Sequence, residues 1–213
     1  MSPSGPFLIK ICGVTTPEDA LQVALAGADA IGINLWSGSK RFVGDDAAAA
    51  RVLAAIPAGV LKVGVFVNAP ADEVAAKAAR LGLDRVQLHG DEAAHDFAAL
   101  SNEILVRAVR VMDHASFAAA NGWHAGLFLY DALVAGYGGG GVTAPWPLIA
   151  AHARRPFLLA GGLHPDNVAE AIRATRPAGV DVASGVESSP GRKDPARVRA
   201  FVDAARATHA GLA

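Results

Sequence analysis

Short, strand-like apolar runs alternate with helix-like segments along the whole chain. The runs are rich in Val, Ile, Leu and Phe, as strands buried on both faces of a parallel sheet are. They predict eight strands: Phe7–Cys12, Asp29–Leu35, Val60–Val67, Arg85–His89, Ile104–Val111, Leu127–Asp131, Pro156–Ala160 and Gly179–Ala183. The segments that follow them predict eight helices: Pro17–Ala28, Asp45–Ile56, Ala71–Leu81, Asp91–Leu100, Asp113–Ala120, Trp146–Ala153, Pro165–Thr175 and Pro195–Thr208.

Eight strand–helix units in a row predict an α/β fold with a single (β/α)8 barrel, the TIM barrel. The 213 residues give about 27 residues per unit, close to the minimum for this fold. A doubly wound open sheet would carry a G-x-G-x-x-G turn after its first strand, and Cys12-Gly13-Val14-Thr15 does not match it. We therefore expect one domain over residues 1–213, with residues 1–6 as a flexible tail.

The composition argues against nucleic-acid binding, membrane insertion and a metal site. Hydrophobic residues make up 52% of the chain and charged residues 18%, and the net charge is −1, so no basic field for nucleic acid is expected. No apolar run approaches the ~18 residues of a membrane span. The N-terminus lacks the basic and apolar parts of a secretory signal, so we expect a cytoplasmic protein. One cysteine and seven scattered histidines give no metal-ligand spacing.

The single cysteine, Cys12, ends the first predicted strand and precedes the helix that starts at Pro17. In a (β/α)8 barrel, this rim is where the catalytic residues lie. Lys10 stands two residues earlier, on the same side of the strand, and a cation there would lower the pKa of the thiol. Taken alone, the segment fits better with a cysteine that acts as a small buried hydrophobe.

A carboxylate ends another predicted strand. Asp131 follows the apolar run Leu127–Tyr130, which places it on the same rim. A helix cap or a loop hydrogen bond is the commoner role for an isolated aspartate at such a position. Together with Cys12, however, Asp131 supplies the proton donor and proton acceptor that an acid–base isomerisation requires.

Two small-residue turns follow the seventh and eighth predicted strands. They are Ala160-Gly161-Gly162-Leu163 and Ala183-Ser184-Gly185. The loops at these places form the phosphate site of many (β/α)8 barrels, because glycine exposes backbone N–H groups to an anion. Each turn alone could be a simple connection, but the pair favours a phosphorylated, sugar-like ligand.

A cationic loop follows the second predicted strand. It contains Lys40 and Arg41, and a guanidinium group can bind a carboxylate through two parallel hydrogen bonds. A solvated surface arginine is the alternative. Either way, the loop favours an acidic ligand.

Seven segments resemble the phosphoribosylanthranilate isomerase family, and VQLHG and DVASGVE-SSPG-KD are the most specific of them. In chain order they are KICG (10–13), SKRFV (39–43), VGVFVN (63–68), VQLHGDE (86–92), LYD (129–131), LAGGLHPDNV (159–168) and GVDVASGVESSPGRKD (179–194). The resemblance implies the isomerase step of tryptophan biosynthesis, an Amadori rearrangement of N-(5-phosphoribosyl)anthranilate to the 1-deoxyribulose phosphate. It implies neither a metal nor an organic cofactor. A closed barrel has no exposed strand edge, so a monomer and a homodimer are equally compatible with the sequence.

The resemblance also implies residue roles. Asp131 would be the general acid that protonates the ring oxygen, and Cys12 the general base that removes the C2′ proton. Arg41 would hold the anthranilate carboxylate. The backbone of two turns would hold the phosphate: Gly161, Gly162, Ser184 and Gly185.

The chain departs from the family pattern in the loop after the sixth strand. Gly140 stands where the family has a threonine, Pro145 replaces an aspartate, and Ala132 replaces the serine that often follows the acid. We expect these three changes to affect how the loop closes and where the Asp131 side chain lies. Tyr137 and Trp146 flank the loop and are expected either to cover the substrate or to pack.

Two other functions fit the same barrel. One is a different phospho-sugar enzyme, such as an epimerase or the indole-glycerol-phosphate lyase subunit, although an epimerase would be expected to show metal-ligating histidines. The other is a phospho-ligand sensor without catalysis, against which the Cys12–Asp131 pair argues.

Overall fold

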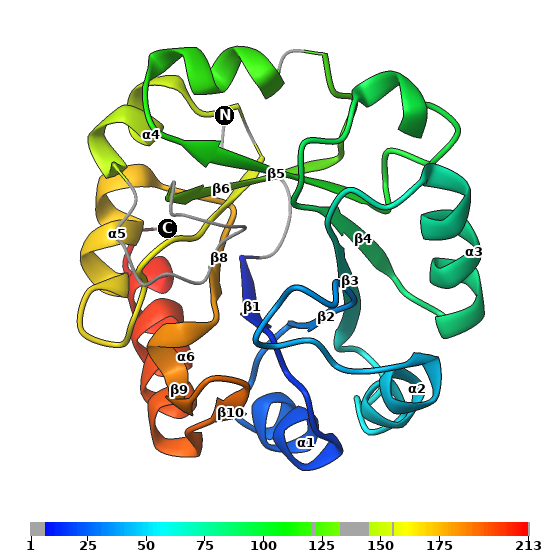
Figure 1. The fold of residues 1–213 in the computed structure, drawn as a ribbon. Helices are drawn as coiled ribbons and strands as arrows, with labels where there is room; N and C mark the ends of the chain where they lie inside the picture. Colours follow the sequence, from blue (N-terminus) through cyan, green and yellow to red (C-terminus); the bar gives the residue numbers. More distant parts are fainter. Residues whose placement is uncertain (1–6, 121, 133–144, 155, 213) are drawn as a thin grey trace.

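Eight parallel strands close into a barrel, as the sequence predicts (Figure 1). The computed structural model describes residues 7–120, 122–132, 145–154 and 156–212. The strands are β1 (Leu8–Cys12), β2 (Ala30–Asn34), β3 (Leu61–Phe66), β4 (Arg85–Leu88), β5 (Leu105–Val111), β6 (Leu127–Ala132), β7 (Phe157–Leu159) and β8 (Gly179–Val182). Pairing of β1 with β8 closes the ring. Two segments for which the sequence makes predictions lie outside the described residues. They are the expected tail, residues 1–6, and residues 133–144, which include Tyr137 and Gly140.

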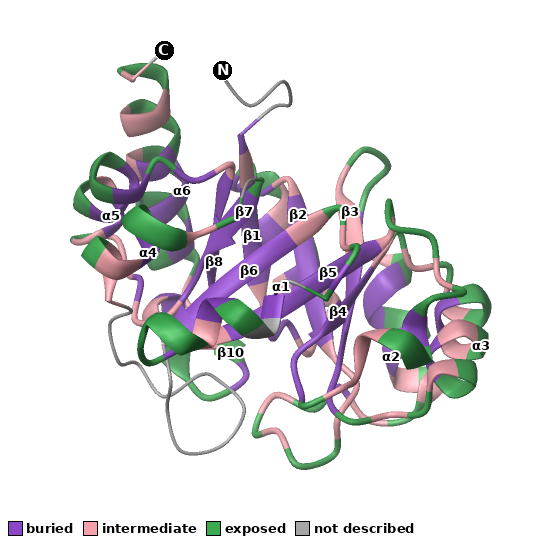
Figure 2. Cartoon of the chain, turned by 90° about the horizontal axis from the view of Figure 1, so that it is seen from above, coloured by how far each residue is buried: buried purple, intermediate pink, exposed green. Residues whose placement is uncertain are grey.

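Helices surround the barrel, with their buried faces toward the strands (Figures 1 and 2). The α-helices are α1 (Pro17–Leu25), α2 (Asp46–Ala54), α3 (Ala71–Leu81), α4 (Trp146–His152), α5 (Val168–Thr175) and α6 (Pro195–Ala210). Side chains of Thr16, Asp45 and Asp194 cap α1, α2 and α6. Gly82 ends α3 in the left-handed region, φ 61°, directly after the predicted end of the helix at Leu81. No described helix is long and apolar enough to span a membrane.

The predicted helix Asp91–Leu100 is wrong. Only a 3-10 turn, η1 (Ala94–Phe97), forms there. The reason is Glu92, whose carboxylate accepts the backbone N–H groups of Asn68 and Gly90 and pairs with Arg107 at 2.5 Å. These bonds hold the start of the segment in a loop conformation.

Two further predicted helices differ from the structure. The segment Asp113–Ala120 forms a 3-10 helix, η2 (His114–Ala120). The predicted helix Pro165–Thr175 begins only at Val168, because the backbone N–H of His164 donates to Asn167 Oδ1 at 2.8 Å and forms a turn instead.

Alternation along the strands separates an outer core from the barrel interior. Ile9 and Ile11 of β1 pack in the outer core between barrel and helices, so Lys10 and Cys12 face inward. By the same rule, Asp131 of β6 faces inward because its neighbour Tyr130 belongs to the outer core. Asp181 of β8 faces inward because Val180 and Val182 do. A small apolar cluster fills part of the interior: Val106, Ala108, Leu129, Leu158 and Ala160.

A short hairpin that the sequence analysis did not predict follows β8. The turn η3 (Ser184–Val186) leads into β9 (Glu187–Ser189), which pairs antiparallel with β10 (Arg192–Lys193). Thr15 Oγ1, from the turn after β1, donates to Gly191 O at 2.7 Å. The hairpin is thereby fixed against the carboxyl end of β1.

We predict that Gly179→Ala destabilises the barrel by about 3 kcal/mol, because overpacking of a tight interior is costly. A Cβ at Gly179 would lie 2.2 Å from Leu8 O and 2.7 Å from Leu158 Cδ2. Urea unfolding measures the change. Gly211→Ala is the control, since its Cβ would meet nothing closer than 3.6 Å. Equal stability of the two variants would contradict the prediction.

Candidate active site

Cys12 lies above a buried ion pair inside the barrel. Lys10 Nζ donates to Asp181 Oδ1 at 2.9 Å, and the Lys10 side chain is 2% exposed. The positive charge of the same ammonium group acts on the Cys12 thiol and lowers its pKa. Gly32 of β2, the register partner of Cys12, makes room for both, since a Cβ there would lie 2.8 Å from Cys12 Sγ and 3.2 Å from Lys10 Cε.

The charge of Lys10 lowers the pKa of the Cys12 thiol, as expected, but the pKa as a whole lies above its usual value. Burial raises the pKa of the thiol, and the charge of Lys10 opposes this only in part. Burial by itself would lower the pKa of Lys10, but Asp181 and Cys12 more than offset it and the pKa lies above its usual value. Lys10 is therefore protonated at neutral pH and stabilises a thiolate once one forms.

Asp131 faces the interior from the carboxyl end of β6 and is buried. His89 Nε2 lies 3.4 Å from Asp131 Oδ2, and Gln87 Nε2 lies 2.9 Å from His89 Nδ1. The sequence analysis did not assign Gln87 or His89 to the site. The alternation of β4 could have done so, because its outward positions, such as Leu88, are apolar.

Arg41 is bound through two parallel hydrogen bonds to a carboxylate of the protein itself. Its Nε donates to Glu187 Oε1 at 2.8 Å, and its Nη2 to Glu187 Oε2 at 2.7 Å. The Arg41 stem crosses Gly13, where φ is +73° and a Cβ would lie 2.4 Å from Arg41 Cδ. The guanidinium group thus lies beside the turn that follows Cys12. The sequence analysis did not foresee the Glu187 pair.

The two predicted phosphate turns contact each other. Gly161 and Gly162 have positive φ values, 84° and 64°, which glycine adopts without strain. Asn167 Nδ2 donates to Gly162 O at 2.9 Å and fixes this turn. In the second turn, a Cβ at Gly185 would lie 1.9 Å from Leu163 O, so only glycine permits the contact. Ser184 begins the second turn, η3.

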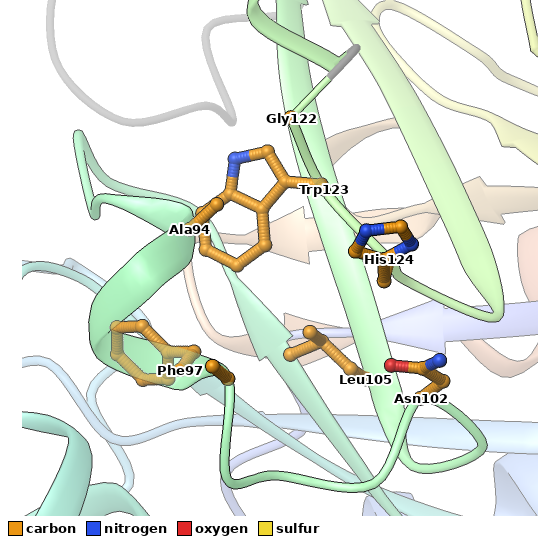
Figure 3. Close-up of a pocket in the computed structure, with 8 residues that line it drawn as sticks. Ala94, Phe97, Asn102, Leu105, Gly122, Trp123 and His124 are labelled. Atoms are coloured by element: carbon orange, nitrogen blue, oxygen red, sulfur yellow. The ribbon is translucent and has the colours of Figure 1, made fainter.

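A separate pocket lies outside the barrel wall, between η1 and the segment before β6 (Figure 3). None of its lining residues is a predicted site residue. They are Ala94, Phe97, Ala98, Asn102, Leu105, Gly122, Trp123 and His124. This pocket is therefore not the candidate active site.

Within the described ranges, no three His, Cys, Asp or Glu side chains gather as they would around a metal ion. The expectation that the protein needs no metal and no organic cofactor stays a prediction.

A closed (β/α)8 barrel with an inward-facing cysteine and aspartate at the carboxyl ends of its strands is typical of a barrel enzyme. Comparison with known families identifies the particular one. The model of the N-(5'phosphoribosyl)anthranilate (PRA) isomerase family matches residues 9–204. The chain belongs to this family, and membership decides against an epimerase or a lyase on a related barrel.

Individual relatives agree with the family match. The chain is 46% identical over 205 residues to N-(5'-phosphoribosyl)anthranilate isomerase of Myxococcus xanthus, covering 93% of this chain and 95% of the relative. It is 44% identical over 218 residues to that of Chromohalobacter salexigens, covering 98% and 99%. The crystal structure of the Thermotoga maritima enzyme superposes with a TM-score of 0.86 at 36% identity, covering 94% of this chain and 99% of that one.

We predict that removing the charge of Lys10 raises the pKa of Cys12 further. In the double variant Lys10→Met/Asp181→Asn, no buried charge is left unpaired. The loss of the ammonium group disfavours the thiolate, and this effect exceeds the opposite effect of losing the Asp181 carboxylate. The rate of alkylation by iodoacetamide, measured against pH, reports the thiolate. The pH midpoint of alkylation should be higher in the double variant than in the wild type. The midpoint of the folded wild type should in turn be higher than that of the urea-unfolded chain. A midpoint that is unchanged or lower in the variant would contradict the role of Lys10.

Proposed function

We propose that this isomerase of tryptophan biosynthesis uses Asp131 as its general acid and Cys12 as its general base. The observation that carries the proposal is that both side chains face the interior at the carboxyl ends of their strands, β6 and β1. A proton donor and a proton acceptor on the same rim suit the conversion of an aldose into a ketose.

In the first step, Asp131 protonates the ring oxygen of N-(5'-phosphoribosyl)anthranilate, and the furanose opens to an iminium ion. The 3.4 Å approach of His89 and the burial of Asp131 restrict where this carboxyl group can point. Restricting the acid to one orientation is what efficient proton transfer requires.

In the second step, Cys12 removes the C2′ proton of the iminium, and the enolamine that results tautomerises to the ketone as C1′ gains a proton. The iminium acidifies the adjacent C–H bond, so a base of modest strength is sufficient. Burial raises the pKa of Cys12, and two cations act against this: Lys10 in the protein and the iminium in the intermediate.

The rest of the site holds the substrate. We propose that the anthranilate carboxylate binds Arg41, and that the backbone N–H groups of Gly161, Gly162, Ser184 and Gly185 hold the phosphate. A crystal structure of a 34% identical isomerase contains reduced 1-(o-carboxyphenylamino)-1-deoxyribulose 5-phosphate, which carries both a carboxylate and a phosphate. The contact between the two turns at Gly185 supports a joint phosphate site.

The proposal also covers where the enzyme works and whether it assembles with a second copy. We place the enzyme in the cytoplasm and expect no nucleic-acid or membrane partner. The isomerase of Thermotoga maritima is described as dimeric, and the chain is 35% identical to it. For this chain, a monomer and a homodimer both stay open.

Loss of either catalytic group should abolish most of the turnover. We expect Cys12→Ala and Asp131→Asn each to lower kcat at least about 100-fold, the usual effect of removing a positioned acid or base. Steady-state kinetics with the phosphoribosylanthranilate substrate measures this, and circular dichroism verifies the fold. Near-normal kcat in one variant would remove that residue from its role.

The phosphate turns give a prediction of their own. Inorganic phosphate should raise the Tm of the wild type, as any ligand of the native state does. In Gly185→Ala, the added methyl group forces the two turns apart, and this Tm increase should disappear. Gly211→Ala, at the end of α6, should keep it. A full phosphate effect in Gly185→Ala would contradict the proposed phosphate site.

A further inference from the structure

The carboxylate of Glu187 accepts hydrogen bonds from three residues beside the proposed site. Its Oε1 accepts Arg41 Nε at 2.8 Å, Lys193 Nζ at 2.8 Å and Gly191 N at 3.3 Å, and its Oε2 accepts Arg41 Nη2 at 2.7 Å. The side chains of Glu187 and Lys193 are 5% and 2% exposed. The β9–β10 hairpin brings these two residues together.

The charges of this cluster do not cancel. Glu187 supplies one negative charge to two cationic side chains, Arg41 and Lys193, and burial lowers the pKa of Lys193. Burial alone would raise the pKa of Glu187, but hydrogen bonds from Arg41 and the charge of Lys193 more than offset it, and the pKa lies below its usual range. The cluster is therefore suited to an anion that arrives from outside the protein.

The geometry decides which part of Arg41 can meet that anion. Glu187 occupies the Nε–Nη2 edge of the guanidinium group, and Gly13 lies directly under the arginine stem. The hydrogen bonds to Glu187 therefore leave the Nη1 side of the Arg41 guanidinium group for a ligand. A guanidinium fixed in advance loses less conformational freedom when it binds a carboxylate.

We propose that Glu187 is a positioning residue for substrate specificity: it holds Arg41 so that Nη1 meets the carboxylate of the substrate's aromatic amine. The proposal rests on the carboxylate-binding role proposed above for Arg41. Stability alone is a weak explanation for the cluster, because the desolvation of buried ion pairs offsets much of their attraction. Lys193 Nζ also donates to Ala183 O at 3.1 Å. Lys193 thus links Glu187 to the start of the second phosphate turn through hydrogen bonds.

Two inhibitors separate positioning from folding. One is the reduced product analogue with its carboxylate, and the other is the same molecule with hydrogen in place of the carboxylate. Calorimetry gives their Kd values for the wild type, Glu187→Gln, Arg41→Ala and the double variant. Glu187→Gln keeps the size of the side chain but turns one acceptor oxygen into an NH2 group that faces the guanidinium.

The wild type should prefer the carboxylate-bearing analogue at least about tenfold, the usual scale for a charge-assisted hydrogen bond. Glu187→Gln should lose most of this preference while its Kd for the other analogue is unchanged. Arg41→Ala should also lose the preference for the carboxylate-bearing analogue. The double variant should show the same preference as Arg41→Ala alone. In turnover, Glu187→Gln should raise KM and leave kcat within a few-fold.

The control is Asp29→Asn, which removes an exposed pair with Arg206 (2.8 Å) at the opposite end of the barrel and should leave the preference intact. A lower Tm in Glu187→Gln with full preference for the carboxylate would overturn the proposal. Equal binding of both analogues by the wild type would overturn the role of Arg41, and with it this proposal. A wild type that neither binds the analogues nor turns over substrate would overturn the proposed function as well.

Discussion

Closure of the barrel through the pairing of β1 with β8 is the constraint on which the site depends. The pairing sets Lys10 opposite Asp181, and alternation along both strands turns these two side chains into the interior. A closed barrel has no free strand edge, so every inward position has a fixed neighbour. Cys12 inherits its position from this register, one step beyond Lys10 on the inward side of β1, with Gly32 opposite on β2.

Burial and charge act against each other throughout the site. The interior that shields Cys12 from water also raises the pKa of its thiol, and the nearby ammonium of Lys10 limits the increase. The same compensation appears at the rim, where Glu187 balances one of two cations. Lys10 and Asp181 are thus paired inside the barrel, as desolvation requires, and the positive charge that Glu187 leaves unbalanced lies where an anionic substrate is expected.

The sequence predicted those features that depend on local pattern. The regular alternation of strand-like and helix-like segments predicted the barrel. The period of two along a strand placed Lys10 on the same side of β1 as Cys12, and the predicted end of α3 at Leu81 agrees with the structure. Contacts between distant segments were beyond this reasoning. The loop at Glu92 replaced a predicted helix, and the Glu187 pair to Arg41 joins residues 146 positions apart. Such contacts depend on the folded barrel, and no local pattern encodes them.

The central claim is that this barrel isomerises a phosphoribosylated anthranilate, and its most direct test is a fluorescence measurement on the wild type. N-(5-phosphoribosyl)anthranilate is generated in the cuvette, and its fluorescence is followed after the purified protein is added. The account predicts a decay whose rate is proportional to the protein concentration. Unchanged fluorescence, from a folded protein that inorganic phosphate still stabilises against heat, would contradict it.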